Sequence, residues 1–239
     1  MKFLQTGQTS HSLISGVLLL LTVWGCGSNT KTDSQTSPAS TTATSTSATS
    51  TAAKKQIVLF YGNSLTAGYG VEPAQAFPAL VGQKIDSAGL NYQVVNAGLS
   101  GETTAGGKSR ISWVMRQPVA VFVLELGGND GLRGLPLSAT RQNLQAIMDT
   151  VRRKSPQATI VLAGMQIPPN MGTTYTKEFR ELFKELADKN GAVLVPFLLE
   201  RVGGIAKLNQ PDGIHPTPAG HKIVANTVWK ILRPVLEKK

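Results

Sequence analysis

The fold of this chain is indicated first by residues 119–131, which are VAVFVLELGGNDG. The apolar run 119–126 is short, rich in branched side chains and without the alternation of polar and apolar residues that a half-exposed strand shows. Such a run is typical of a strand that is buried on both faces of a parallel sheet. A glycine-rich polar segment follows it directly, so we expect the strand to end at a loop that carries functional groups.

Four further runs of this kind lie at 57–61, 92–95, 159–163 and 192–195. Segments with helical periodicity separate the runs and lie at about 74–87, 105–116, 138–154 and 175–189. A last helix is expected over about 218–236, because Thr217 is a suitable N-cap and Pro218 suits the first turn. The alternation predicts an α/β protein with three layers, α/β/α, around a parallel sheet of about five strands. Such sheets place their functional sites beyond the carboxyl ends of the strands.

The composition points to a globular protein with an excess of basic residues. The 239 residues include 24 Lys and Arg against 14 Asp and Glu, a formal net charge of +10, which suggests a nucleic acid or a membrane surface as partner. The basic residues are scattered, and the densest cluster, 152–154, falls at the end of a predicted helix, where cations interact favourably with the helix dipole. We therefore expect no nucleic-acid partner, and we expect the charge to favour approach to membrane surfaces.

The first 25 residues have the features of an export signal. Their apolar stretch, 13–24, is too short to cross a bilayer core of about 30 Å. Residues 21–26, LTVWGC, resemble a bacterial lipobox, in which the cysteine thiol is acylated and becomes the new N-terminus. We therefore expect lipidation of Cys26 and a lipid anchor in a membrane that faces the periplasm or the cell exterior. The alternative is plain secretion with a free thiol, and the single cysteine excludes a disulfide within the chain.

A low-complexity segment separates this cysteine from the rest of the chain. Sixteen of the 27 residues from 27 to 53 are Ser or Thr, so residues 26–53 are predicted to be the lipidated cysteine and a disordered tether. Residues 54–239 are long enough for one well-cored domain. The sequence leaves the oligomeric state open, and we expect a monomer.

Candidate functional groups follow the predicted strands. Ser64 stands at a strand-to-helix turn, where its hydroxyl and its N–H can face the crevice, although a serine also suits a helix cap there. Gly101 follows the second strand and Asn129 the third, and each also fits an ordinary turn. Asp212 precedes His215 by three residues across a glycine, so its carboxylate can accept from the imidazole Nδ1–H and leave Nε2 to take a proton from a serine.

Taken together, these groups are the set that acyl transfer requires: a nucleophile, a base, its carboxylate partner and donors for an oxyanion. A zinc site is not predicted, because Asp212, His215 and His221 lack the spacing of zinc ligands. Glu125 lies within an apolar strand, and a buried carboxylate needs partners that the sequence does not identify.

These residues and their order resemble the SGNH hydrolase superfamily, also called the GDSL esterases, over residues 55–235. The signature positions are Ser64, Gly101, Asn129 and His215, with Asp212 completing the triad. The chain is most similar to the bacterial periplasmic acyl-CoA thioesterase, lysophospholipase and arylesterase branch. That similarity is carried by ELGGNDGLRG at 125–134, MQIP at 165–168 and DGIHP at 212–216.

The resemblance implies the flavodoxin-like SGNH hydrolase fold and a serine esterase that cleaves acyl esters, thioesters or lysophospholipids through an acyl-Ser64 intermediate. The N–H groups of Ser64 and Gly101 and the amide of Asn129 would form the oxyanion hole, and no metal or cofactor is implied. One position departs from the family, because Asn63 stands where the family has Asp. Asn keeps the shape and an acceptor oxygen but removes a negative charge beside the nucleophile.

The substrate pocket is predicted from two loops. Leu132 and Leu135 follow the oxyanion Asn in a glycine-flanked segment, and Ile167 and Pro168 follow the fourth strand, so the two pairs are expected to face an acyl chain. Ordinary loop residues over the core are the alternative. Two other functions stay open: a carbohydrate O-deacetylase of the same superfamily, and a non-catalytic surface lipoprotein that keeps the fold as a scaffold.

Overall fold

A parallel five-stranded sheet in the order β2-β1-β3-β4-β5 forms the centre of the computed structural model, which describes residues 54–238. The strands are β1 (Gln56–Gly62), β2 (Tyr92–Gly98), β3 (Val121–Glu125), β4 (Thr159–Ala163) and β5 (Val193–Val195). All five predicted strands are present, and β2 continues three residues beyond the predicted end at 95. The predicted export signal, Cys26 and the tether lie outside the described residues.

Seven α-helices lie within the described residues. They are α1 (Ser64–Ala67), α2 (Phe77–Ser87), α3 (Thr104–Val114), α4 (Gly128–Leu132), α5 (Leu137–Lys154), α6 (Thr173–Asn190) and α7 (Pro218–Glu237). Short 3₁₀ turns occur at Pro73–Gln75, Pro169–Met171 and Ala206–Leu208. The five long helices are those that the sequence predicts, whereas α1 and α4 were not predicted. Thr217 caps α7 as expected, because its side chain accepts from Gly220 N.

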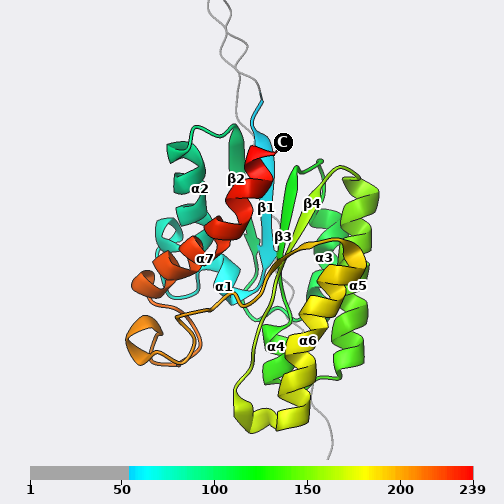
Figure 1. Cartoon of the computed structure of the whole chain (residues 1–239), viewed down its shortest axis with the longest axis vertical. Coiled ribbons are helices and arrows are strands. Elements are labelled where there is room, and N and C mark those ends of the chain that lie inside the picture. The colour runs from blue at the N-terminus through cyan, green and yellow to red at the C-terminus, as the bar shows by residue number, and fades with distance from the viewer. Residues whose placement is uncertain (1–53, 239) are drawn as a thin grey trace, which may run out of the picture. The chain divides into compact units, whose positions relative to one another are not determined.

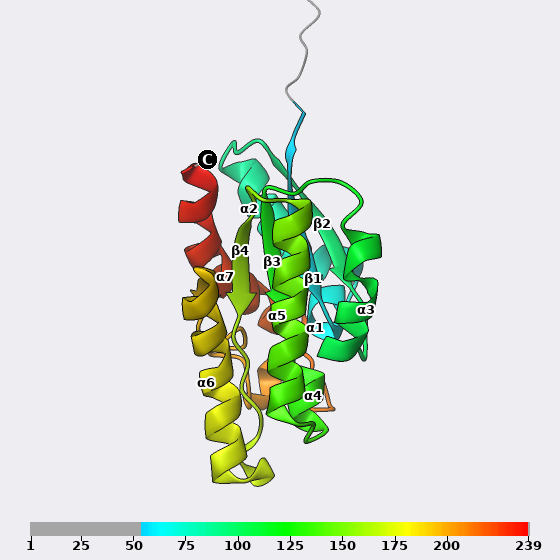
Figure 2. The same cartoon turned by 90° about the vertical axis from the view of Figure 1, so that its right-hand side faces the viewer.

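The helices form two layers around the sheet. Helices α2 and α7 pack together on one face, and α3, α5 and α6 cover the other, as Figure 1 and the turned view of Figure 2 show. The predicted three-layer α/β/α architecture is therefore confirmed. Among residues 54–238, no helix is long and apolar enough to cross a membrane.

The core follows from the patterning of the strands and helices. The side chains of β1 from Ile57 to Tyr61 and all those of β3 are buried, as expected for central strands covered on both faces. Helix α5 buries Leu144, Ile147, Met148 and Val151, which recur at helical spacing and form one apolar stripe in the core, where α5 packs on α3.

The strand order creates a crevice beside β1 and β3. The chain leaves β1 toward β2 on one side and reaches β3 on the other, which makes the carboxyl ends of β1 and β3 the switch point where such sheets bind ligands. The register places Gly62, at the end of β1, beside Gly98 of β2 and Glu125 of β3. Ser64 and Asn129 follow these two central strands directly.

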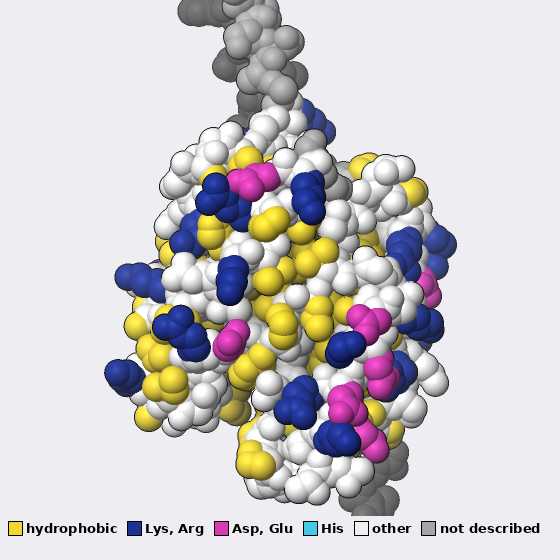
Figure 3. Space-filling view, viewed as in Figure 1, with side chains coloured by type: hydrophobic (Ala, Val, Ile, Leu, Met, Phe, Trp, Pro, Cys, Tyr) yellow, Lys and Arg dark blue, Asp and Glu magenta, His cyan; other side chains and the backbone are white. Residues whose placement is uncertain are grey.

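Charged side chains are dispersed on the face that carries α6 and α7. Figure 3 shows Lys and Arg spread over this face and mixed with Asp and Glu near α6, with apolar side chains between them. The basic residues visible there do not form a single patch of the kind that a nucleic-acid backbone requires.

Candidate active site

Ser64 is held on a tight turn between β1 and α1. It is the first residue of α1, and it is buried, with 8% of its surface exposed. The side chain of Asn63 caps the helix, because its Oδ1 accepts from Leu65 N at 2.9 Å. The nucleophile candidate therefore does not serve as the cap itself, since the preceding residue performs that role.

His215 lies directly beside Ser64, although 151 positions separate them in the sequence. Its Nε2 is 2.8 Å from Ser64 Oγ, and its Nδ1 is 2.6 Å from Asp212 Oδ2. Asp212 Oδ1 also accepts from the backbone N–H groups of Ile214 and His215, at 2.9 and 3.0 Å. These contacts, with the hydrogen bond from the His215 backbone the largest, lower the pKa of Asp212 to about 2.

The contacts define which nitrogen of His215 carries the proton. An ionised Asp212 only accepts, so the proton of the neutral imidazole belongs on Nδ1. Nε2 is then free to accept from the Ser64 hydroxyl, which is the arrangement of a base poised at a serine nucleophile. The ring of Tyr69 packs on the imidazole, with centroids 4.6 Å apart.

The two other signature residues lie on segments that contact each other, Gly101 in the loop after β2 and Asn129 in α4. Asn129, in α4, donates from Nδ2 to the backbone oxygen of Glu102 at 2.9 Å, and Arg133 Nη2 donates to the Gly101 oxygen at 3.3 Å. Gly101 has φ +79°, a left-handed conformation that favours glycine. The Asn129 amide has a second hydrogen, which can point at a ligand.

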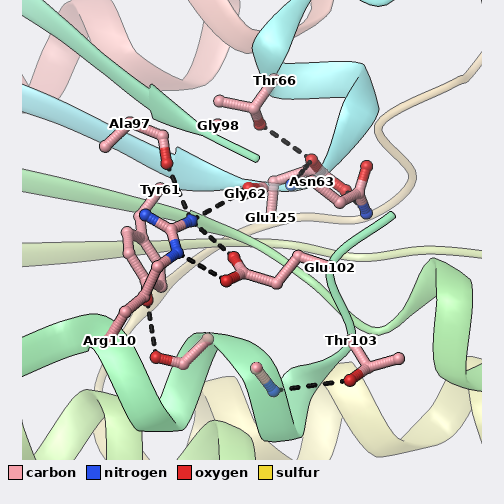
Figure 4. Close-up of polar contacts among 12 residues, drawn as sticks. Tyr61, Gly62, Asn63, Thr66, Ala97, Gly98, Glu102, Thr103, Arg110 and Glu125 are labelled. Atoms are coloured by element: carbon pink, nitrogen blue, oxygen red, sulfur yellow. Dashed lines mark hydrogen bonds and ion pairs between the residues drawn. The ribbon is translucent and has the colours of Figure 1, made fainter. Parts of the chain in front are cut away.

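A buried ion pair supports this loop, and sequence analysis did not identify it. Arg110 of α3 donates through Nε and Nη2 to both oxygens of Glu102, whose side chain is 3% exposed. Arg110 Nη2 also donates to the Ala97 oxygen at 2.9 Å, and the guanidinium lies 4.2 Å from the ring centroid of Tyr61. Figure 4 shows Arg110 joining the end of β2 to the Glu102 loop.

The crevice opens into an apolar pocket of about 470 Å³. Its lining includes Ser64, Asn129 and His215, together with the predicted Leu132, Ile167 and Pro168. Leu135 is not part of this lining, and its backbone oxygen accepts from Tyr175. A larger hollow of about 740 Å³ lies between α2 and α7, but none of the predicted site residues lines it. The chemistry-bearing groups therefore meet at the smaller pocket.

The pocket combines a serine, a histidine and an amide, and the described residues hold no cluster of metal-ligand type. Within residues 54–238, no group of three or more His, Cys, Asp or Glu side chains is arranged to hold a metal ion. The structure brings Ser64, Asp212 and His215 into one chain of contacts and places Asn129 in the same pocket. The assignment of these groups as triad and oxyanion donors stays a prediction.

Comparison with known proteins gives matches over most of the described chain. Residues 60–223 match the model of the GDSL-like Lipase/Acylhydrolase family. The chain is 38% identical to Esterase TesA of Pseudomonas aeruginosa over 185 residues, which cover 77% of this chain and 91% of that protein. It is 36% identical to Thioesterase 1/protease 1/lysophospholipase L1 of Escherichia coli K12 over 186 residues, 77% of this chain and 87% of that protein.

A solved structure of an esterase has a similar fold. The psychrotrophic esterase EstA from Pseudoalteromonas sp., in a form inhibited by monoethylphosphonate, superposes with a TM-score of 0.72 at 28% identity. The match covers 77% of this chain and all of that one.

Proposed function

This chain belongs to the GDSL-like lipase/acylhydrolase family and is a serine ester hydrolase, and on that premise we propose that it cleaves acyl esters and thioesters through an acyl-Ser64 intermediate. The observation that carries the proposal is the continuous contact from Ser64 Oγ to His215 Nε2 and from His215 Nδ1 to Asp212. Such a chain of contacts activates a hydroxyl that is otherwise a weak nucleophile.

The first half-reaction forms the acyl-enzyme. Ser64 Oγ bonds to the carbonyl carbon while its proton passes to His215 Nε2, and ionised Asp212 stabilises the resulting imidazolium. The negative charge that develops on the carbonyl oxygen is stabilised by the N–H groups of Ser64 and Gly101 and by the Asn129 amide. The bond to the leaving alcohol or thiol then breaks, and the leaving group takes the proton from His215.

The second half-reaction regenerates the enzyme. Water gives a proton to His215 Nε2, and the water oxygen bonds to the acyl carbon, so that the ester bond to Ser64 breaks. Ser64 recovers its proton and the carboxylic acid leaves. Each step needs only the described side chains and water.

The pocket favours substrates with an apolar acyl chain. Leu132, Ile167 and Pro168 line it beside the nucleophile. The transfer of a hydrocarbon chain from water to such apolar walls is favourable. The names of the relatives, esterase and thioesterase/lysophospholipase, agree with oxygen and sulfur esters of such chains. We extend these substrate classes to this chain, including lysophospholipids.

The location of the enzyme is part of the same proposal. The apolar segment 13–24 and the lipobox-like residues that end at Cys26 support export and lipidation, with residues 54–239 as a monomeric catalytic domain on the tether. Mass spectrometry of the mature protein tests this. An N-terminal peptide that begins at acylated Cys26 is expected, and an unmodified Cys26 would contradict the anchor.

The catalytic proposal is tested with an activity probe and an ester panel. A fluorophosphonate is expected to label the native protein and Ser87→Ala, a matched exchange in the exposed part of α2, but not Ser64→Ala. Hydrolysis of p-nitrophenyl esters is expected to rise in kcat/KM from acetate to octanoate. Activity on acetate alone would favour the carbohydrate O-deacetylase, and absence of both labelling and turnover would favour the non-catalytic scaffold.

A further inference from the structure

The two ends of the Asn63 side chain have different partners, and its Oδ1 also lies 3.4 Å from Ser64 Oγ. Its Oδ1 accepts from Leu65 N at 2.9 Å and thereby caps α1, and its Nδ2 donates to Glu125 Oε1 at 2.8 Å. A backbone N–H only donates, so the oxygen of the amide must face Leu65 and the NH₂ group must face Glu125. The orientation of Asn63 is therefore fixed by its neighbours.

Glu125 lies under the nucleophile turn and accepts hydrogen bonds from both Asn63 and Thr66. Besides the Asn63 amide, its Oε2 accepts from Asn63 N at 3.1 Å and from Thr66 Oγ1 at 2.8 Å. Gly62, which is paired with Glu125 in the sheet, permits this approach, because a Cβ there would lie 2.5 Å from Oε2. Figure 4 shows the carboxylate between β1 and the start of α1.

Glu125 has polar partners but no cationic one. Its side chain is buried, and among residues 54–238 no charged side chain is hydrogen-bonded or ion-paired to it. Arg110, which supports the neighbouring loop, is ion-paired to Glu102 instead. Burial raises the pKa of Glu125 to about 7, although hydrogen bonds from Thr66 and Asn63 lower it.

We propose that Asn63 and Glu125 are a matched donor–acceptor pair of positioning residues, in which the Asn63 amide donates to Glu125 Oε1 and so holds the cap of the Ser64 helix. The inference rests on Ser64 being the nucleophile of the proposed function. It also gives a physical reason why Asn63 can stand where the family has Asp. An amide at 63 supplies its own N–H to Glu125, whereas a carboxylate at 63 would need a proton shared between two acids.

Exchange of the two side chains tests the pair. In Glu125→Gln, one end of the new amide faces a fixed donor, either Asn63 Nδ2 or Asn63 N, so one contact is lost at every pH. We expect kcat to fall about tenfold, with KM changed less than twofold. In the double variant Asn63→Asp/Glu125→Gln, the donor and acceptor are exchanged, and kcat is expected to return to within about threefold of wild type.

The single variant Asn63→Asp gives a readout that a purely structural role would not move. Two carboxyl groups then meet at hydrogen-bond distance and must share a proton, which is lost at a pH above the value of about 7 for Glu125 alone. The ratio of its kcat to that of wild type is therefore expected to decline between pH 7 and pH 10. Division by the wild-type kcat at each pH removes any pH dependence that the two proteins share.

The controls separate this inference from the proposed function. Glu185→Gln makes the same exchange in the exposed pair with Arg141 and is expected to leave the kcat ratio flat. The pairing would be overturned if Glu125→Gln lowered kcat by the same factor whether residue 63 is Asn or Asp. It would also be overturned if the ratio of the Asn63→Asp kcat to the wild-type kcat did not change up to pH 10. Either result would leave the wild-type activity, and so the proposed function, intact. Should Glu125→Gln fail to fold, recovery of a folded, active double variant is the expected rescue. Failure of both would count against the pairing. Loss of fluorophosphonate labelling in wild type would instead refute the proposed function.

Discussion

Replacement of Arg110 by methionine probes how the Glu102 loop is held. Arg110→Met keeps the apolar stem of the side chain but removes both donors from a carboxylate that is 3% exposed. Removing one partner of a buried pair costs about 3–5 kcal/mol, because the other charge stays buried without a partner. The Arg110 side chain is 20% exposed, so water reaches the pair and we expect the lower end, about 3 kcal/mol.

Thermal unfolding measures this loss. For a domain of this size, 1 kcal/mol shifts Tm by about 2–4 °C, so Arg110→Met is expected to lower Tm by about 6–12 °C. The double variant Glu102→Gln/Arg110→Met removes the stranded charge as well and is expected to recover most of this loss. The matched control is Arg141→Met in the exposed pair with Glu185, where less than about 1 kcal/mol is expected.

The same variant also affects catalysis. The Glu102 backbone oxygen accepts from Asn129, so a displaced loop misplaces a predicted oxyanion donor and kcat falls while the fluorophosphonate still labels Ser64. A Tm within 2 °C of wild type, or a double variant less stable than the single one, would refute the argument that a buried charge pair holds this loop.

Three further predictions concern the oxyanion donor, the pocket and the pH dependence of stability. Asn129→Ala is expected to lower kcat on p-nitrophenyl esters about a hundredfold with little change in Tm, and an unchanged kcat would remove Asn129 from the oxyanion hole. Gly131→Ala places a Cβ 2.6 Å from Ile167 Cγ2, so it is expected to raise KM for octanoate more than for acetate; equal effects would contradict the acyl wall. Burial lowers the pKa of His221 to about 4, so its contribution to stability is lost as pH falls from 6.5 toward 4, whereas the raised pKa of Glu125 makes stability fall as pH rises from 4.5 toward 7. His221→Asn keeps an acceptor for Phe77 N and removes the effect of the histidine, so that the effect of Glu125 remains. The free energy of unfolding of this variant, measured in urea, is therefore expected to fall as pH rises from 4.5 to 7. A free energy that does not change over this range would contradict the raised pKa of Glu125.

The architecture could be predicted because its signals are local. The runs around 57–61 and 119–126 are apolar without alternation, which identified the two central strands, and the order of strands and helices identified the layers. The short helices α1 and α4 escaped prediction, since four or five residues are too few to show a helical period.

The candidate site was predictable only as an inventory. Ser64, Asp212 and His215 could be named from their residue types and their places after strands, but their distances follow from the fold. The partners of Glu125 and the Arg110–Glu102 pair could not be named. The Glu125 contacts depend on β1 and β3 being neighbours, and strand order is a long-range property that local patterns do not encode. The Arg110–Glu102 pair is local, but it depends on the path of the loop that precedes α3, which residue types alone do not define.

The position of β1 has a practical consequence for attaching this enzyme to a solid support. The described chain enters the sheet at Gln56 and crosses it in a single strand, and Ser64 follows at the far end. Seven strand residues at about 3.3 Å each put the entry point roughly 23 Å from the nucleophile turn. Coupling to a bead through residues upstream of Gln56 therefore leaves the substrate entrance directed away from the support, whereas coupling through the loops that follow the strands would obstruct it.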